Sequence, residues 1–515
     1  MSDTEDAAGQ TSRRQFLTAA GAVTGATLGA VALAPQSASA ATTARIPKHW
    51  DEVADVVVIG TGFAGLAAAV EARAAGADTL IIEKMAVHGG NSIINGGDFA
   101  AAGTKVQAEA GVQDSPEQML QDMLKAGSWL NNPELAKLVA YGSAEALEWT
   151  QTYIGAQYFR LNFHGGHSVK RSHQCVGASG AELVNKLLAK ALSLGARVEK
   201  RTKLVRIVTS DTGRVLGVEV RRGYLYPNED SGAPAFIKAR RGVVLASGGF
   251  SQDVKLRQIY DPRITPKFES TNQPGATGEA LLAACKIGAM DTQMDWIQLG
   301  PWTSPDETGF GQVPQFCERL VGYGLMVDPA TGKRFFKETG NRKERADAII
   351  RIGHPVLIIG DSEAVAKQVL PKVLEHTVDL GVIRKFDTLD ALAQHYGMPV
   401  TAFQEQVARW NGFVEKKLDE DFGCMIFKDA TTTAKPPYFV ARLWPRVHHT
   451  MGGLVIDKDA RVMSFDLAPV SGLYAAGEAT GGVHGAVRLG SVAMADCVVF
   501  GRIAGKNAAK EKAWA

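Results

Sequence analysis

The sequence DVVVIGTGFAGLAAAVEARAAGADTLIIEK, residues 55–84, decides the fold class of the chain. An apolar, β-branched run leads through Gly60, Gly62 and Gly65 into an alanine-rich stretch, and a second apolar run ends at Glu83. A strand, a G-x-G-x-x-G turn, a helix and a second strand with an acid 23 residues after the first glycine are typical of a dinucleotide-binding βαβ unit. We therefore predict an α/β protein with a Rossmann-like domain.

The small residues of this turn predict the contacts of the cofactor. Without side chains, the turn lets backbone N–H groups and the helix N-terminus approach a pyrophosphate. We expect Gly60, Gly62, Ala64 and Gly65 to line this site. The carboxylate of Glu83 is expected to bind a ribose hydroxyl.

Further glycine-rich segments favour FAD over NAD. HGGNS at 88–92 and GGD at 96–98 would let the backbone pack against an isoalloxazine, and GLYAAGE at 472–478 would reach the ribityl chain. Several separated segments of this kind indicate one elongated cofactor. The residues predicted to bind it are Gly90, Asn91, Ser92, Gly96, Gly97, Ser247, Gly248, Thr277, Gly278 and Glu478.

Composition excludes several classes of function. A chain of 515 residues with 45% apolar residues can bury more than one core, which indicates a large enzyme with at least two domains. A net charge of only +2 does not indicate nucleic-acid binding. The five cysteines form no C-x-x-C pattern, so neither a metal site nor a haem attachment is predicted.

The N-terminus predicts export. Residues 11–40 contain the pair Arg13 and Arg14, a weakly apolar run and the small-residue pattern ASA at 38–40. This pattern is typical of a cleaved twin-arginine signal peptide, here residues 1–40, and an uncleaved anchor helix is the alternative. The mature chain would be periplasmic or otherwise exported, and no later stretch is long and apolar enough to span a bilayer.

From about Asp55 to Lys510 the chain resembles the flavoprotein subunit of soluble fumarate reductases and flavocytochromes c, within the fumarate reductase/succinate dehydrogenase family. The resemblance implies a reductase of a carbon–carbon double bond conjugated to a carboxylate. Besides the glycine segments, the motifs that carry the resemblance are SVKRSH at 168–173, GATGE at 275–279, GKRFFKETGNR at 332–342, VHHTMGG at 447–453 and GEATGGVHGAVRLGS at 477–491.

The resemblance also implies an architecture and its partners. A Rossmann-like FAD-binding domain would comprise residues 50–295 and 447–515, and an α+β capping domain would be inserted at 296–446. Because GGNSIINGG at 89–97 lacks the histidine that tethers covalent flavin in some members, non-covalent FAD is implied. Since neither a haem module nor a covalent-FMN domain is recognised, a separate c-type cytochrome is the implied donor, in anaerobic respiratory electron transport.

The matched motifs imply an active site. Arg488 and His448 would hold the substrate carboxylate, flavin N5 would deliver hydride to one carbon, and Arg342 would protonate the neighbouring carbon. A planar guanidinium suits bidentate binding of a carboxylate. Glu318 is the remaining member of the family's proton relay. The motifs add His449, Arg488, Ser491 and Val492 to the expected cofactor contacts.

Three departures from the family pattern point to a different substrate. Fumarate reductases have Gln-x-His-Pro-Thr where this chain has QLGPW at 298–302, so Gly300 replaces the histidine that grips a second carboxylate. The family's Thr-Glu pair becomes Cys317-Glu318, and the relay arginine becomes Val321. A monocarboxylate such as urocanate, methacrylate or an aryl acrylate is therefore expected. The aromatic residues expected to shape its pocket are Trp296, Trp302 and Tyr323.

Three alternatives stay open. The chain could be a fumarate reductase proper. It could be a flavoenzyme similar to 3-ketosteroid dehydrogenases, although these need a tyrosine pair and no carboxylate clamp. It could also be a flavin-binding electron carrier without substrate chemistry.

Overall fold

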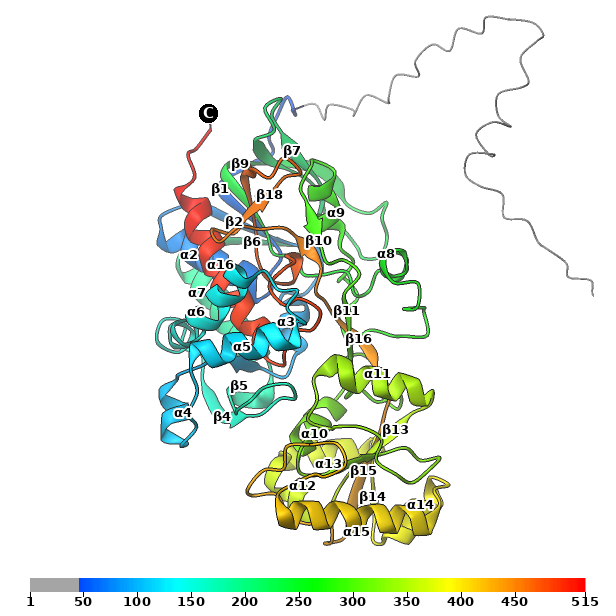
Figure 1. Ribbon diagram of the computed structural model, residues 1–515. Helices are drawn as coiled ribbons and strands as arrows, with labels where there is room; N and C mark the ends of the chain where they lie inside the picture. Colours follow the sequence, from blue (N-terminus) through cyan, green and yellow to red (C-terminus); the bar gives the residue numbers. More distant parts are fainter. Residues whose placement is uncertain (1–45, 515) are drawn as a thin grey trace, which may run out of the picture. The chain divides into compact units, whose positions relative to one another are not determined.

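The computed structural model describes residues 46–514, so the predicted signal peptide lies outside the described residues. A large sheet forms the centre of the part that contains the G-x-G-x-x-G turn (Figure 1). Its main path runs β18–β19–β9–β1–β2–β6, and all of its pairings except β18–β19 are parallel. The strands are β18 (Arg461–Met463), β19 (Pro469–Ala475), β9 (Ala233–Leu245), β1 (Glu52–Ile59), β2 (Thr79–Glu83) and β6 (Arg197–Lys200).

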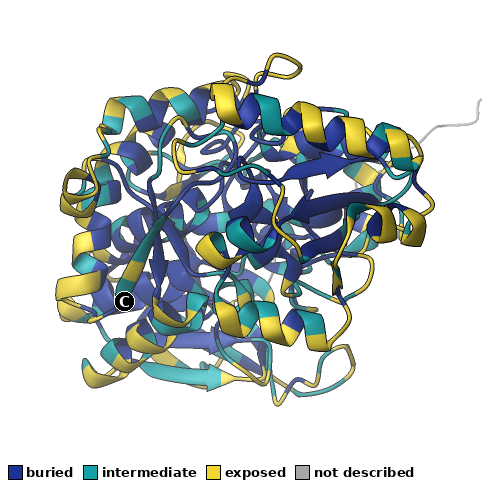
Figure 2. Ribbon diagram, turned by 90° about the horizontal axis from the view of Figure 1, so that it is seen from below, coloured by how far each residue is buried: buried dark blue, intermediate teal, exposed yellow. Residues whose placement is uncertain are grey.

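Helices pack against the parallel strands, whose continuous apolar sequence requires cover from solvent. The alanine-rich α2 (Phe63–Ala74) packs against α16 (Val492–Lys510) and α7 (Ala181–Ser193). Small residues bring α2 and α16 very close, because a Cβ on Gly505 would lie 2.1 Å from the carbonyl oxygen of Ala68. Figure 2 shows the buried sheet beneath helices whose outer faces are exposed.

Smaller elements surround this sheet. The hairpin β7 (Thr202–Thr209) and β8 (Val215–Arg222) extends it through antiparallel pairing of β8 with β9. The chain also forms a three-stranded sheet in the order β3–β5–β4 and a two-stranded pair β10–β17. The bounds are β3 (Asp98–Ala100), β4 (Tyr158–Asn162), β5 (Ser172–Cys175), β10 (Asp291–Thr292), β17 (Gly453–Leu454), α3 (Gly90–Ile94), α4 (Lys105–Glu109), α5 (Pro116–Ala126), α6 (Pro133–Thr152), α8 (Val254–Tyr260) and α9 (Glu279–Cys285).

A second core belongs to an antiparallel sheet with the order β12–β13–β15–β14 and the helices around it. This core extends from Trp302 to Leu443. Its strands are β12 (Leu325–Val327), β13 (Val356–Gly360), β14 (Ile383–Phe386) and β15 (Tyr438–Leu443). Its helices are α10 (Val313–Leu320), α11 (Arg342–Ile352), α12 (Ser362–Gln368), α13 (Pro371–Asp379), α14 (Leu389–His395) and α15 (Val400–Lys416).

The chain passes between the two cores through an antiparallel pair, β11 (Ile297–Gly300) with β16 (Arg446–Thr450). The predicted α/β class with a Rossmann-like domain is confirmed by the parallel sheet and its crossover helices. We propose that β11 and β16 are the boundary of the inserted capping domain, close to residues 296 and 446.

Candidate active site

The G-x-G-x-x-G turn joins β1 to α2 with backbone geometry that requires glycine. Gly60 has a φ of +107°, and a Cβ there would lie 2.5 Å from the carbonyl oxygen of Ala246. A Cβ on Gly65 would lie 2.1 Å from the carbonyl oxygen of Gly60. The turn therefore stays bare of side chains where the N-terminus of α2 opens toward a cavity, the arrangement that suits a pyrophosphate.

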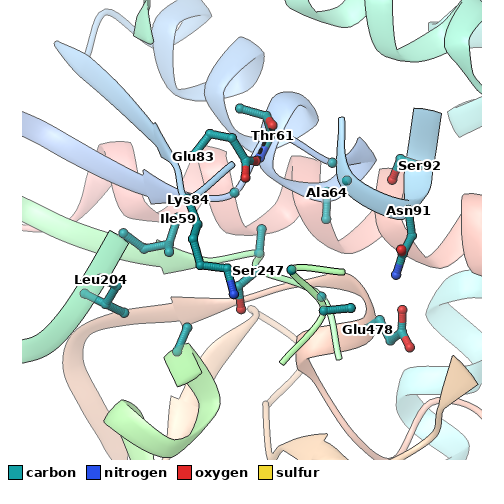
Figure 3. Close-up of a pocket in the computed structure, with 18 of the residues that line it drawn as sticks. Ile59, Thr61, Ala64, Glu83, Lys84, Asn91, Ser92, Leu204, Ser247 and Glu478 are labelled. Carbon is teal, nitrogen blue, oxygen red and sulfur yellow. Dashed lines mark hydrogen bonds between the residues drawn. The ribbon is translucent and has the colours of Figure 1, made fainter. Parts of the chain in front are cut away.

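Glu83 is fixed at the end of β2, beside this turn. Its Oε1 accepts a hydrogen bond from the backbone N–H of Met85 at 2.9 Å, and its Oε2 accepts one from the N–H of Thr61 at 3.2 Å. The hydroxyl of Thr61 also donates to it (Figure 3). The carboxylate thus lies at the end of β2 beside the turn, where the 23-residue spacing from Gly60 predicts a contact with a ribose hydroxyl.

An elongated cavity, called here the first cavity, runs from this turn toward α3. Figure 3 shows Leu204 and Lys84 toward one end and Asn91, Ser92 and Glu478 toward the other. The predicted cofactor residues that line it are Gly60, Gly62, Ala64, Glu83, Gly90, Asn91, Ser92, Ser247, Gly248, Gly278 and Glu478.

A second cavity adjoins the first and shares Phe63, Asn91, Ser92, Glu478 and Cys497 with it. The predicted residues that line only this second cavity are Gly96, Glu318, Arg342, His448, His449, Arg488 and Ser491. All four residues predicted to be catalytic therefore lie around one space, although they come from α10, α11, β16 and the loop before α16.

Four predicted cofactor residues line neither cavity: Gly65, Gly97, Thr277 and Val492. Gly97 packs against the backbone of Ser179, because a Cβ there would lie 2.7 Å from its carbonyl carbon. Thr277 accepts a hydrogen bond from Nζ of Lys84 at 2.6 Å. Val492, the first residue of α16, is buried. These residues lie beside the two cavities without lining them, and their contacts with the cofactor stay a prediction.

Sequence reasoning missed part of the first cavity. Lys84 forms an ion pair with Glu279 at 2.9 Å, and Lys203 and Leu204 of β7 complete the wall at this end. An alternating strand in a hairpin has no local pattern that distinguishes a ligand contact from a core contact. Both lysines are paired with glutamates, Lys84 with Glu279 and Lys203 with Glu229.

His448 and Arg488 lie close enough in the second cavity to act on one substrate group. The hydroxyl of Thr271 and Nδ1 of His448 are 2.8 Å apart, which fixes the imidazole. Burial, Arg488 and Arg342 hold the pKa of His448 well below its usual value, so the ring is neutral at neutral pH. Arg488 donates through Nη1 to the carbonyl oxygen of Leu489 at 3.0 Å, while its buried Nε has no partner among the described residues.

Arg342 begins α11 and points toward the same space. Its guanidinium lies 5.2 Å from the ring centre of Trp302, and its Nε and Nη1 have no hydrogen-bond partner within residues 46–514. Burial lowers the pKa of Arg342 to about 10, an effect that Glu318 partly opposes. Because this guanidinium loses a proton more easily than an exposed one, it suits the role of an acid.

Glu318 lies behind Arg342 and is surrounded by basic groups. Its Oε2 is 3.0 Å from Nδ1 of His164, and its Oε1 accepts a hydrogen bond from Arg345. Burial alone would raise the pKa of Glu318, but Arg345 and His164 together hold it well below its usual value. Glu318 is therefore a carboxylate in the resting protein.

One wall of the second cavity is aromatic and lies beside His448 and Arg342. A Cβ on Gly300 would lie 2.9 Å from the indole of Trp302, so Trp302 occupies the space that a longer side chain at position 300 would need. The centre of the Trp302 ring lies 4.6 Å from the centre of the His448 ring and 5.6 Å from that of Phe310, which also lines the cavity. Trp302 and Phe310 make this wall aromatic, and the buried indole Nε1 of Trp302 has no hydrogen-bond partner among the described residues.

The prediction that Trp296 and Tyr323 also shape this pocket is wrong. Trp296 lines a separate cavity beside α11, and Tyr323 lines another on the opposite side of Glu318. The prediction failed because distance along the chain is a poor guide to position across β11 and α10. Of the three aromatic residues, Trp302 alone lies against the second cavity.

The two cavities together suit FAD. The bare turn at Gly60 and the anchored Glu83 fit a nucleotide with a pyrophosphate. Ser247 lines the first cavity with a buried hydroxyl that has no hydrogen-bond partner among the described residues, as a polar ligand would require. A long cofactor would extend from there to Asn91 and Glu478, where the second cavity begins.

Comparison with known proteins identifies the family. Residues 55–494 match the family described as FAD binding domain. The chain is 39% identical over 504 residues to an acrylate reductase flavoprotein subunit from Shewanella woodyi, covering 96% of this chain and 97% of the relative. It is 34% identical over 467 residues to a urocanate reductase from Eggerthella lenta, covering 88% of this chain and 74% of the relative.

Among solved structures, the open conformation of a flavocytochrome c3 fumarate reductase is similar, with a TM-score of 0.70 and 35% identity. The match covers 90% of this chain and 79% of that chain. The chain therefore belongs to the FAD-binding flavoproteins of the fumarate reductase/succinate dehydrogenase family and is a FAD-dependent oxidoreductase.

Proposed function

We propose that this protein reduces a carbon–carbon double bond conjugated to a single carboxylate. The observation that carries the proposal is the position of Trp302, which fills the space beside Gly300 and presents its aromatic ring to the cavity that Arg488 also lines. A second charged carboxylate placed there would lose its hydration without a matching donor from residue 300, which is costly. An uncharged or apolar group would fit this wall.

The proposed division of labour follows from the geometry. Arg488, whose buried Nε has no partner within residues 46–514, binds the carboxylate, and the neutral ring of His448 donates to it from the side opposite Thr271. When bound, FAD supplies the hydride. Arg342 gives one proton to the carbon next to the one that receives the hydride, and the buried positive charges stabilise the negative charge that develops on the substrate.

Acrylate, methacrylate, urocanate and aryl acrylates are the substrate class that this site favours. Two relatives support the class, since one is named an acrylate reductase subunit and another a urocanate reductase. Fumarate is the second candidate because of Arg319. This arginine lines the second cavity, and its buried Nη1 has no partner among the described residues, so it could bind a second carboxylate.

The cofactor attachment, the donor and the location complete the proposal. FAD is bound without a covalent tether, because GGNSIINGG lacks the histidine expected for one. Electrons come from a separate c-type cytochrome; the name of the acrylate reductase relative, a flavoprotein subunit, supports a separate partner.

Export by the twin-arginine route rests on Arg13 and Arg14. None of the helices within residues 46–514 has the length and apolar character that a bilayer crossing requires.

Reoxidation of the reduced enzyme tests the proposed reaction. The flavin is reduced anaerobically with dithionite, excess reductant is removed, and acrylate, urocanate, cinnamate, propionate or a 3-ketosteroid is added. The proposal expects rapid flavin reoxidation by the unsaturated acids and none by propionate. If no acid reoxidises the flavin, the protein is an electron carrier; if the oxidised enzyme instead accepts electrons from the steroid, it is a dehydrogenase.

A double substitution tests the role of the aromatic wall. Gly300→His alone would collide with the Trp302 indole, so Gly300→His is combined with Trp302→Thr, which together restore the family motif. The pair is expected to raise kcat/KM for fumarate relative to acrylate. Trp296→Thr, at a tryptophan that does not line the second cavity, is the matched control. An unchanged ratio in the double variant would remove the structural basis of the proposal.

A further inference from the structure

Glu318 and Arg319 form a wall between the second cavity and another one, called here the third cavity. Around this third cavity lie Arg160, Lys170 and Gln368, which are partly exposed, whereas Glu318 and Arg319 are buried. The third cavity therefore leads from the surface to the back of the carboxylate that faces Arg342. Its lining is strongly polar, as a path for protons requires.

The position of the family's relay arginine also lies on this third cavity, but here it is Val321, which can neither hold nor pass a proton. Arg345 does not take over that role. It pairs with Glu318, but its side chain is fully buried and lines neither the second nor the third cavity. Arg345 is thus placed as a counter-ion that keeps Glu318 ionised, without a route to solvent.

His164, which lines the second cavity together with Asp98, offers a further connection to Glu318. Its Nδ1 is 3.0 Å from Oε2 of Glu318, and its Nε2 is 3.6 Å from Oδ2 of Asp98 without a hydrogen-bond partner among the described residues. Asp98 in turn accepts a hydrogen bond from Nη2 of Arg319 at 3.0 Å. A chain of contacts thus leads from Glu318 through His164 and Asp98 to Arg319, which lies in the wall of the third cavity.

The packing around His164 holds the ring in place. A Cβ on Gly490 would lie 2.6 Å from the Cβ of His164, so glycine at 490 leaves the room that the histidine occupies. Both neighbours of the ring, Asp98 and Glu318, are buried carboxyl groups. An imidazole between two carboxyl groups can accept a proton at one nitrogen and release one at the other.

We propose that His164 replaces the lost relay arginine and resupplies the proton of Arg342 from solvent in the third cavity. The inference rests on the proposed function. In each turnover Arg342 gives one proton to the substrate carbon and becomes neutral. His164 passes its Nδ1 proton to the carboxylate of Glu318, and the carboxyl group so formed protonates Arg342 and becomes a carboxylate again. His164 takes one proton at Nε2 from the side of Asp98 and Arg319, and the ring returns to the Nδ1–H tautomer before the next turnover. The net uptake is one solvent proton, and no electrons move along this chain of contacts.

Half-reactions of the FAD-loaded enzyme with His164→Gln test this role. Glutamine keeps a hydrogen-bonding side chain but cannot pass a proton between two nitrogens. Reduction of the flavin by dithionite is expected to be unchanged, since it does not use the relay. Turnover with acrylate is expected to fall by about a hundredfold at an unchanged KM, the lower end of a general acid's contribution, with a larger solvent deuterium isotope effect.

Two further variants keep the test independent of folding. Asp98→Asn, which preserves shape, is expected to slow acrylate turnover in the same way. Adding Val321→Arg to His164→Gln puts the family's arginine back on the third cavity and is expected to restore part of the rate. Wild-type turnover and isotope effect in His164→Gln would overturn the relay. A wild-type enzyme inert toward every enoate would instead overturn the proposed function itself.

Discussion

Replacing Arg342 by alanine should remove catalysis and leave the fold and the flavin in place. The side chain makes no hydrogen bond from Nε or Nη1 to the described residues, so its truncation breaks little that holds α11. The N-cap of the helix also persists, because Asn341 accepts from the N–H of Glu344 at 3.0 Å. The expected loss is therefore in the reaction.

The size of this loss follows from the assigned role. A positioned acid contributes about 10²–10⁴ in rate, which corresponds to roughly 3–5 kcal/mol of the activation barrier. Burial lowers the pKa of Arg342 to about 10, close to the ordinary pKa of a lysine. Arg342→Lys keeps a cation of similar acidity and should retain more activity than Arg342→Ala.

The assay is steady-state acrylate reduction with reduced methyl viologen, normalised to bound flavin. Arg351→Ala, an exposed arginine of the same helix, is the matched control and should behave as wild type. The reasoning is refuted if Arg342→Ala keeps near wild-type turnover while flavin content and melting temperature are unchanged. The acid would then lie elsewhere, and Glu318 would be the next residue to replace.

Three further outcomes are expected. Acid precipitation should release intact FAD into the supernatant, and flavin that stays with the polypeptide would contradict non-covalent binding. Arg13→Lys with Arg14→Lys should leave active protein in the cytoplasm, as cell fractionation would show, and normal export of this variant would exclude the twin-arginine route. Burial raises the pKa of Glu478 from 4.5 to about 7, so between these values the folded, flavin-free protein binds a proton that the unfolded chain releases. Its free energy of unfolding in urea should fall as the pH rises through this window, and that of the Glu478→Gln variant should fall less. An equal pH dependence in the two proteins would disprove the shift.

Features encoded within short segments could be predicted from the sequence. The turn at Gly60 and the acid at Glu83 lie in one βαβ unit, and the structure places both at the first cavity. The spacing determines this result, because parallel strands joined by one helix bring their carboxyl ends to a common edge. The resemblance extended the prediction to Arg342, His448 and Arg488, which no local pattern would have brought together.

Contacts between distant segments could not be predicted in the same way. His164 lies 154 residues from Glu318 along the chain, and it looks like any histidine in a glycine-rich loop until folding places it beside that carboxylate. Lys203 and Leu204 belong to a hairpin whose alternating pattern is typical of many strands. The sequence shows that Gly300 and Val321 replace two polar residues of the family pattern. The structure adds that Trp302 fills the space beside Gly300.

The most direct test of the central claim is the ratio of kcat/KM for acrylate to that for fumarate, measured with the same FAD-loaded enzyme and the same reduced viologen. Each charge-assisted hydrogen bond missing at the second carboxylate costs roughly 1.5–3 kcal/mol, or about tenfold or more in kcat/KM. The account predicts a ratio of about ten or higher in favour of acrylate. A ratio below one would contradict it and would indicate that Arg319 binds the second carboxylate.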